Sequence, residues 1–102
     1  MSEFIFAYHG GKMPESPEEG AKLMEKWNAW IGGLDGAMVN PGAPLGMSKT
    51  VSADNVSDGG GSNPLSGYSI VKADSLDIAV ELTKGCPHLE HGTIEVAETV
   101  QM

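Results

Sequence analysis

The sequence predicts a single α+β domain with a ferredoxin-like fold, in which two helices cover one face of an antiparallel sheet. The chain of 102 residues has the size of one domain, residues 1–102, with one core. Its 40% hydrophobic and 20% charged residues are typical of a globular protein. Its apolar patterns follow the order strand, helix, strand or hairpin, strand, helix, strand, which a split βαβ fold requires.

The first strand and the first helix have the clearest patterns. Residues 3–9 place three aromatic side chains on one side and Ile5, Ala7 and His9 on the other, which predicts a buried strand. Ser16 and Pro17 then supply an N-cap and a first-turn proline, and Gly32-Gly33 stops the helix. From Glu18 to about Leu34, apolar residues recur at spacings of three and four and form one stripe: Leu23, Met24, Trp27, Trp30, Ile31 and Leu34.

The middle of the chain has weaker signals. Residues 37–45 are interrupted by Pro41 and Pro44, which suits an edge strand or a strand that ends in an irregular turn. Residues 48–56 alternate only weakly. Residues 58–64 contain three consecutive glycines and little apolar content, which predicts a loop.

The last third predicts a strand, a helix and a closing strand. Residues 67–73 form the strand, and Asp74 or Ser75 caps a helix whose inner face carries Leu76, Ala79, Val80 and Thr83. Gly85 ends that helix. Residues 93–100 alternate, with Glu95 pointing outward.

Two helices on the same side of a sheet leave its other face uncovered. Ile5, Ala7, Ile70 and Val71 therefore cannot all be buried by the helices. A second copy of the sheet would cover the exposed face, and two-fold pairing is the commonest arrangement of small oligomers. We therefore expect a homodimer.

Charge and cysteine content exclude several classes of protein. The net charge of −8 repels phosphate backbones, so no nucleic-acid partner is expected. Cys86 is the only cysteine and cannot form an intramolecular disulfide. No apolar run approaches the roughly 18 residues of a membrane helix, and the first residues lack the features of a secretion signal. We expect a cytoplasmic protein with no membrane partner.

Four stretches of the C-terminal half carry a family resemblance: Asp58-Gly59, the segment from Gly67-Tyr68 to Glu81, Gly85-Cys86-Pro87 and residues 92–96. With them the chain resembles the YCII-related family, and more closely its DGPF branch. The resemblance covers most of the chain, because the strand at residues 4–8, the helix start at residues 16–19 and the turn at residues 40–44 also fall where the family has them. It implies a dimeric α+β barrel of ferredoxin-like subunits. Most members of the family are uncharacterised, a few relatives resemble enzymes that act on small aromatic compounds, and others are fused to sigma-factor-like proteins.

The sequence departs from the family pattern in two places. Catalytic YCII proteins pair a His in the first helix with an Asp near its end, whereas Met24 and Leu34 stand there in this chain. The Asp-Gly turn of the branch motif is kept, but Gly60-Gly61 replaces its Pro and Phe.

His9 and Asp58 are the candidate catalytic residues. His9 ends the first strand beside Gly10-Gly11, where a ligand could approach the backbone, and a carboxylate such as Asp58 could orient its imidazole for general-base work. A surface or structural histidine is the competing interpretation. Trp27, Trp30 and Tyr68 are candidate binding residues, although core packing is the simpler role for the two tryptophans.

Other residues are weaker candidates. His88, Glu90 and His91, together with His9, carry atoms that could bind a metal, but such histidines more often cap a helix end and face water. Cys86 is expected to be a packed thiol rather than a nucleophile, because it follows a helix C-terminus. No metal and no cofactor are expected.

Two functions remain open. The first is a small-molecule enzyme or binding domain that uses His9 and a carboxylate in a pocket. The second is a non-catalytic dimeric interaction or regulatory module.

Overall fold

The computed structural model describes residues 2–11, 15–34, 36–59, 61 and 64–100. Pro14 and, in the glycine-rich loop, Gly60, Ser62 and Asn63 lie outside the described residues. The elements are, in chain order, β1 (Ser2–Gly10), α1 (Pro17–Gly32), β2 (Met38–Pro44), β3 (Lys49–Val51), β4 (Val56–Asp58), β5 (Leu65–Ala73), α2 (Leu76–Thr83), the short 3-10 helix η1 (Pro87–Glu90) and β6 (Gly92–Glu98).

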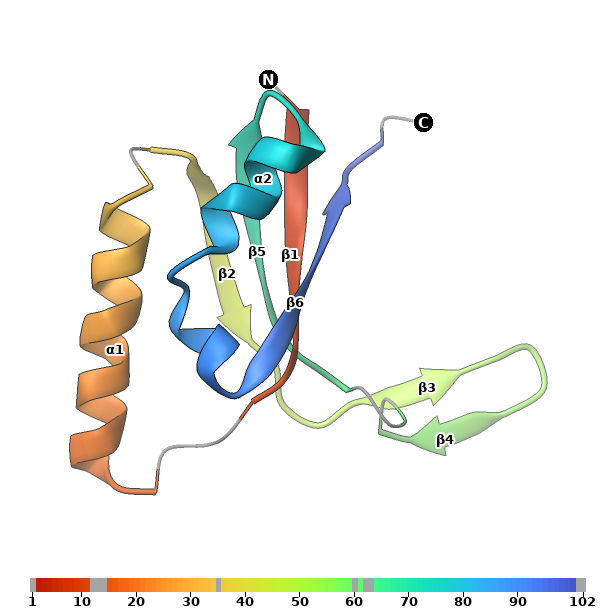
Figure 1. Ribbon diagram of the computed structural model, residues 1–102. Coiled ribbons are helices and arrows are strands. Elements are labelled where there is room, and N and C mark those ends of the chain that lie inside the picture. The colour runs from red at the N-terminus through yellow and green to blue at the C-terminus, as the bar shows by residue number, and fades with distance from the viewer. Residues whose placement is uncertain (1, 12–14, 35, 60, 62–63, 101–102) are drawn as a thin grey trace.

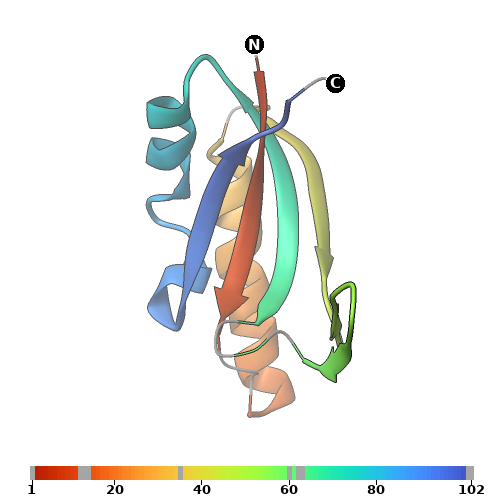
Figure 2. The ribbon, with the colours of Figure 1, turned by 90° about the vertical axis from the view of Figure 1, so that its right-hand side faces the viewer.

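The main sheet is antiparallel and has the strand order β2-β5-β1-β6. Both helices lie on one of its faces (Figure 1). Figure 2 looks onto the opposite face, which we call the open face, with α1 behind the strands and α2 at the left beyond β6. This arrangement confirms the ferredoxin-like α+β prediction.

The core lies between the sheet and the helices. The alternation predicted for the first strand is confirmed, because Phe4, Phe6 and Tyr8 are buried. On β5, Ser69 and Val71 share this face. Val71 therefore lies under the helices and does not belong with the uncovered residues among which the sequence analysis placed it.

The helix starts are confirmed by their capping bonds. The backbone N–H of Glu19 donates to Ser16 Oγ over 3.1 Å, and that of Ile78 donates to Ser75 Oγ over 3.2 Å. A cap of this kind satisfies a backbone donor that the helix leaves unpaired.

Within the described residues, no helix is long and apolar enough to cross a membrane.

The apolar stripes of both helices are only partly covered. On α1, Trp30 is buried but Met24 is 59% exposed. On α2, Ala79 and Thr83 face the core, whereas Leu76 and Val80 are largely exposed. The prediction for this face of α2 is therefore correct for Ala79 and Thr83 and wrong for Leu76 and Val80. The helix is only eight residues long, so few of its side chains reach the sheet.

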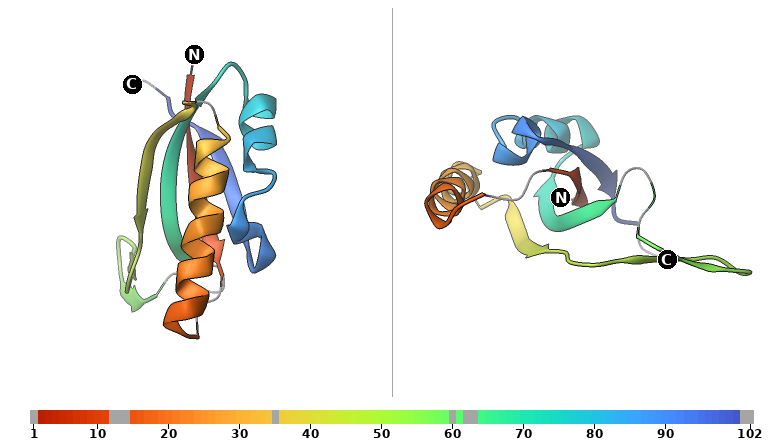
Figure 3. Two further views of the ribbon diagram at one scale, coloured as in Figure 1. Left: turned by 90° about the vertical axis from the view of Figure 1, so that its left-hand side faces the viewer. Right: turned by 90° about the horizontal axis from the view of Figure 1, so that it is seen from below.

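A second, two-stranded sheet interrupts the fold between β2 and β5. Strands β3 and β4 pair antiparallel as a hairpin, with Val51 opposite Val56 and Lys49 opposite Asp58. The hairpin projects from the body of the domain (Figure 3). The weak alternation of residues 48–56 gave no prediction of it, and Asp58 ends β4 at the point where the loop was expected to begin.

Candidate functional site

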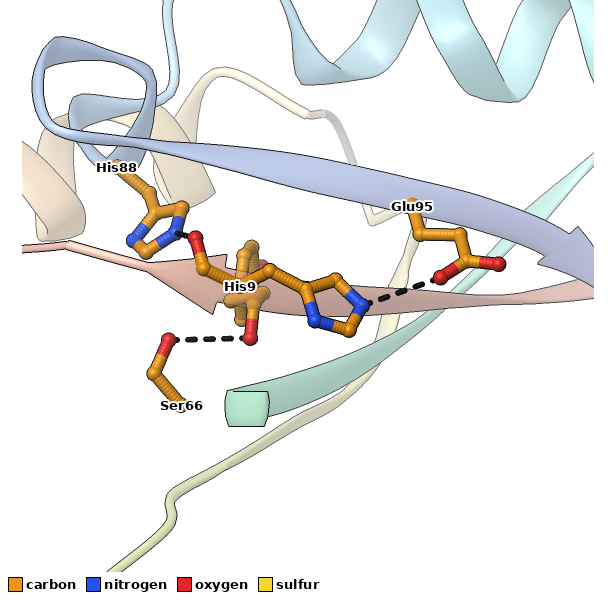
Figure 4. A network of polar contacts seen from close by, with 5 residues as sticks. His9, Ser66, His88 and Glu95 are labelled. Carbon is orange, nitrogen blue, oxygen red and sulfur yellow. Dashed lines mark hydrogen bonds and ion pairs between the residues drawn. The ribbon is translucent and has the colours of Figure 1, made fainter. Parts of the chain in front are cut away.

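His9 is paired with a carboxylate on the open face of the sheet. Its Nε2 lies 3.1 Å from Glu95 Oε1 (Figure 4). The side chain of His9 is 14% exposed and that of Glu95 is 70% exposed. The pairing follows from the strand register: β1 and β6 place Ala7 opposite Glu95 and His9 opposite Thr93, so His9 and Glu95 are diagonal neighbours on one face.

This geometry sets the chemistry of the imidazole. An ionised carboxylate only accepts hydrogen bonds, so Nε2–H of His9 donates to Glu95. In the neutral ring, Nδ1 then carries the basic lone pair. A carboxylate that fixes the tautomer and steadies the protonated ring is the arrangement that a general base uses.

The open face around this pair is apolar. Strand register places Tyr68 opposite Ala7 and Ile70 opposite Ile5, and all four side chains are half-buried. The face therefore combines one acid–base pair with an apolar wall, which is the composition of a ligand site.

The end of β1 that carries His9 is anchored from η1. The His88 ring lies against that of Tyr8, with centroids 5.2 Å apart, and its Nε2 lies 2.9 Å from the backbone oxygen of His9. Because a carbonyl oxygen only accepts, Nε2–H of His88 is the donor. Ser66 Oγ also donates to the backbone oxygen of Tyr8 over 3.0 Å (Figure 4). These bonds hold His9 in place.

Two glycines make room for the His88 ring. A Cβ atom at Gly92 would lie 2.5 Å from His88 Nε2 and 2.4 Å from the backbone oxygen of His9. A Cβ atom at Gly11 would lie 3.0 Å from His88 Cε1. The ring fits only because both positions lack side chains.

On the helix side, Tyr8 begins a buried chain of hydrogen bonds. Its hydroxyl donates to Ser69 Oγ over 2.8 Å, and Ser69 Oγ donates to the backbone oxygen of Pro41, also over 2.8 Å. Burial raises the pKa of Tyr8 to about 12, although the Ser69 bond opposes the shift. The phenol is therefore neutral at physiological pH and has a structural role.

The structure does not bring Asp58 to His9. Lys49 Nζ lies 2.7 Å from Asp58 Oδ1 across the exposed hairpin, and no hydrogen bond or ion pair joins Asp58 to His9. Glu95 is the carboxylate beside the imidazole in the protomer. The outward position of Glu95 in the last strand was the sequence signal that could have identified it.

The two tryptophans lie on the helix side and Tyr68 on the open face. Trp30 is buried, stacks on Phe6 at 6.3 Å and donates from Nε1 to the backbone oxygen of Leu82 over 3.0 Å. Trp27 meets the rings of Tyr8 and Trp30 edge-on, at 5.4 and 5.5 Å. These contacts are those of an aromatic core.

An open groove of about 750 Å³ runs between α1 and the segment that leads into η1. Trp30 lies in one wall and Cys86 in the other, and Lys26 Nζ reaches Glu90 Oε1 over 3.4 Å. Burial raises the pKa of Cys86 to about 11, so the thiol is protonated at neutral pH, as expected of a packed cysteine. The groove offers apolar surface but no activated nucleophile.

The histidines of η1 do not meet at a metal site. His88 is directed to the backbone of His9, while His91 is exposed at the end of η1. Among the residues that the structure describes, no group of three or more His, Cys, Asp or Glu side chains could hold a metal ion.

The sequence matches no protein-family model, and no curated protein matches it. A solved structure does match: 5-chloro-2-hydroxyhydroquinone dehydrochlorinase (TftG) from Burkholderia phenoliruptrix AC1100, in complex with 2,5-dihydroxybenzoquinone. The TM-score is 0.57 at 15% sequence identity, over 98% of this chain and 95% of TftG. The likeness therefore extends over the whole domain and shows a shared ferredoxin-like α+β fold.

Proposed function

We propose that this protein is a small-molecule-binding, enzyme-like member of the YCII-related family, in which His9 and Glu95 form an acid–base pair. The observation that carries the proposal is the 3.1 Å contact between His9 Nε2 and Glu95 Oε1, on the sheet face that also carries the half-buried side chains of Ile5, Ala7, Tyr68 and Ile70. Such a pair can exchange a proton with a bound compound, because Glu95 stabilises the imidazolium that forms.

The ligand class follows from the composition of the face. Ile5, Ile70 and the ring of Tyr68 offer flat apolar surface, and His9 offers one directed acceptor. A small hydroxylated aromatic compound matches both, since its ring packs against the wall and its acidic hydroxyl donates to His9. The fold shared with TftG, an enzyme seen with a dihydroxybenzoquinone, supports the choice of such a compound as a probe.

The proposal includes the homodimer. In the protomer the open face is bordered by solvent, and Glu95 is 70% exposed. A second copy on this face would exclude water and strengthen the electrostatic interactions of the pair. Asp58 remains a prediction from sequence, without a contact to His9 in the protomer.

The test is a titration with 2,5-dihydroxybenzoquinone, followed by NMR of ¹⁵N-labelled histidine rings and ¹³C-labelled isoleucine methyls. We expect saturable shifts at His9 and Ile70. Glu95→Gln should weaken binding about tenfold, because a hydrogen bond to a charged group contributes about 1.5 kcal/mol or more. Glu98→Gln is the matched control: it lies on the same strand, and its register partner Phe4 places it on the other face.

The absence of saturable shifts at both His9 and Ile70 would contradict the proposed site. So would equal affinity for the wild type and Glu95→Gln.

A non-catalytic dimeric interaction module is the second candidate function. Met24 and Leu34 stand where the catalytic dyad of the family would be, which favours it. It predicts a stable dimer without saturable binding of the quinone at His9.

A further inference from the structure

The β3–β4 hairpin, which we call the arm, carries apolar side chains that are largely exposed. Val51 and Val56 face each other across the hairpin and are 73% and 57% exposed. Met47, just before β3, is fully exposed. The register places Lys49 and Asp58 two residues further along, on the same face as the valine pair.

The arm has little support from its own protomer. Its strands are three residues each, and its other bonds are local, such as the 2.7 Å bond from Thr50 Oγ1 to the backbone oxygen of Gly59. In the described part of the chain, no other helix or strand packs extensively against it. An isolated two-stranded hairpin is marginally stable in water, so a persistent arm needs another surface.

The arm projects on the side of the sheet that the helices leave open. Figure 2 shows the open face toward the viewer, with the green hairpin at the lower right below the end of β2, α1 behind the strands and α2 at the left beyond β6. Seen from below in Figure 3, the hairpin runs out on the side of the sheet opposite α2. The uncovered side chains of Ile5, Ala7 and Ile70 lie on that same side.

The area of the open face explains why an arm is needed. Four strands of seven to nine residues make a face of about 19 by 25 Å, or on the order of 500 Å². A stable interface buries about 800 Å² on each partner. An arm about 10 Å wide and 17 Å long adds roughly 170 Å² and covers a similar area of the partner. With one arm from each copy, the interface reaches the size that a stable dimer requires.

We propose that two copies of this chain dock through their open faces, and that the arm of each copy packs against the other copy through its apolar pair Val51 and Val56. Two-fold symmetry makes the contact reciprocal, since each copy both gives an arm and receives one. The proposal rests on the homodimer of the proposed function and adds the element that closes it. It does not depend on the ligand.

The experiment is sedimentation velocity on the wild type, on Val51→Lys and on Val56→Lys. Val80→Lys is the matched control, because Val80 is 42% exposed on α2, which lies on the other side of the sheet. We expect a wild-type dimer, an increase of at least tenfold in the dimer Kd for each arm variant, and a change of less than twofold for the control.

A second variant separates lost contacts from a melted hairpin. The double substitution Val51→Thr with Val56→Thr keeps β-branched residues and strand propensity while it removes apolar surface. It should also weaken the dimer at least tenfold, with an unchanged circular dichroism spectrum. In a mixed sample of labelled and unlabelled wild type, isotope-filtered NMR should show contacts from the valine methyls to the other chain.

Three results would overturn the proposal: a monomeric wild type, dimers that all arm variants leave intact, or valine contacts only within one chain. The quinone titration separates this failure from that of the proposed function. If the quinone binds at His9 but the arm substitutions leave the dimer intact, only the proposed role of the arm is overturned. If the arm substitutions weaken the dimer but no quinone binds, only the proposed ligand site is overturned.

Discussion

Gly92→Ala should destabilise the protein by about 1.5–5 kcal/mol, although the backbone of Gly92 is not in the left-handed region. The new methyl would lie 2.4 Å from the backbone oxygen of His9, 2.5 Å from His88 Nε2 and 3.0 Å from the backbone nitrogen of Gly11. Two of these atoms are backbone, so the His88 ring must move away and the end of β6 must also shift away from β1.

The magnitude follows from what is lost. Expelling His88 breaks its hydrogen bond to His9, worth about 1 kcal/mol, and its contact with Tyr8, worth about 0.5–1.5 kcal/mol. Backbone displacement adds about 1–3 kcal/mol. The lower chain entropy of alanine in the unfolded state offsets about 0.5–1 kcal/mol.

The assay is urea unfolding followed by tryptophan fluorescence. Gly46→Ala is the control, because a Cβ atom there meets nothing within 4 Å; its stability should stay within about 0.5 kcal/mol of the wild type. The His88 ring in Gly92→Ala should also lose its fixed tautomer by ¹⁵N NMR. A stability near that of the wild type, with the tautomer of His88 retained, would refute the proposed anchoring of β1.

Three further predictions follow from the core and the charge. Burial raises the pKa of Cys86 from 9.0 to about 11 and that of Tyr8 from 10.0 to about 12. Because the unfolded chain loses these protons first, the stability is full below pH 9. It should then fall by about 1.4 kcal/mol per pH unit between pH 9 and 11 through Cys86, and by a similar slope between pH 10 and 12 through Tyr8. Urea unfolding at pH 8 and 10.5 should show this loss, and Cys86→Ala should remove the part that begins near pH 9. Trp30→Phe should cost about 2–3 kcal/mol, since it leaves the backbone oxygen of Leu82 without its donor, while Trp27→Phe should cost less; equal values in urea unfolding would contradict the contacts described. Finally, each protomer carries a net charge of −8, so added NaCl should tighten the dimer in sedimentation experiments, and weakening by salt would indicate an interface held by ion pairs.

The fold could be predicted because local patterns specify it. The alternation in the first strand identified Phe4, Phe6 and Tyr8 as core residues, and the capping serines Ser16 and Ser75 fixed the helix starts. These features depend on neighbours in the chain, for which period and cap chemistry are sufficient.

The partner of His9 could not be predicted, because it depends on strand register. His9 was recognised beside its glycines, but a register shift of one residue would turn Glu95 to the other face. The donor from His88 is a tertiary contact between residues 79 positions apart. Asp58 was the nearest guess from an Asp-Gly turn, and the hairpin that carries it had too weak an alternation to be recognised.

The most direct test of the central proposal is a crystal structure at neutral pH of the protein soaked with 2,5-dihydroxybenzoquinone. The proposed function predicts the ring on the open face, against Ile70 and Tyr68, with a hydroxyl about 3 Å from the imidazole of His9 and Glu95 beside that imidazole. A quinone seated in the α1–η1 groove, or an open face bare of ligand in a crystal that binds the compound elsewhere, would contradict it.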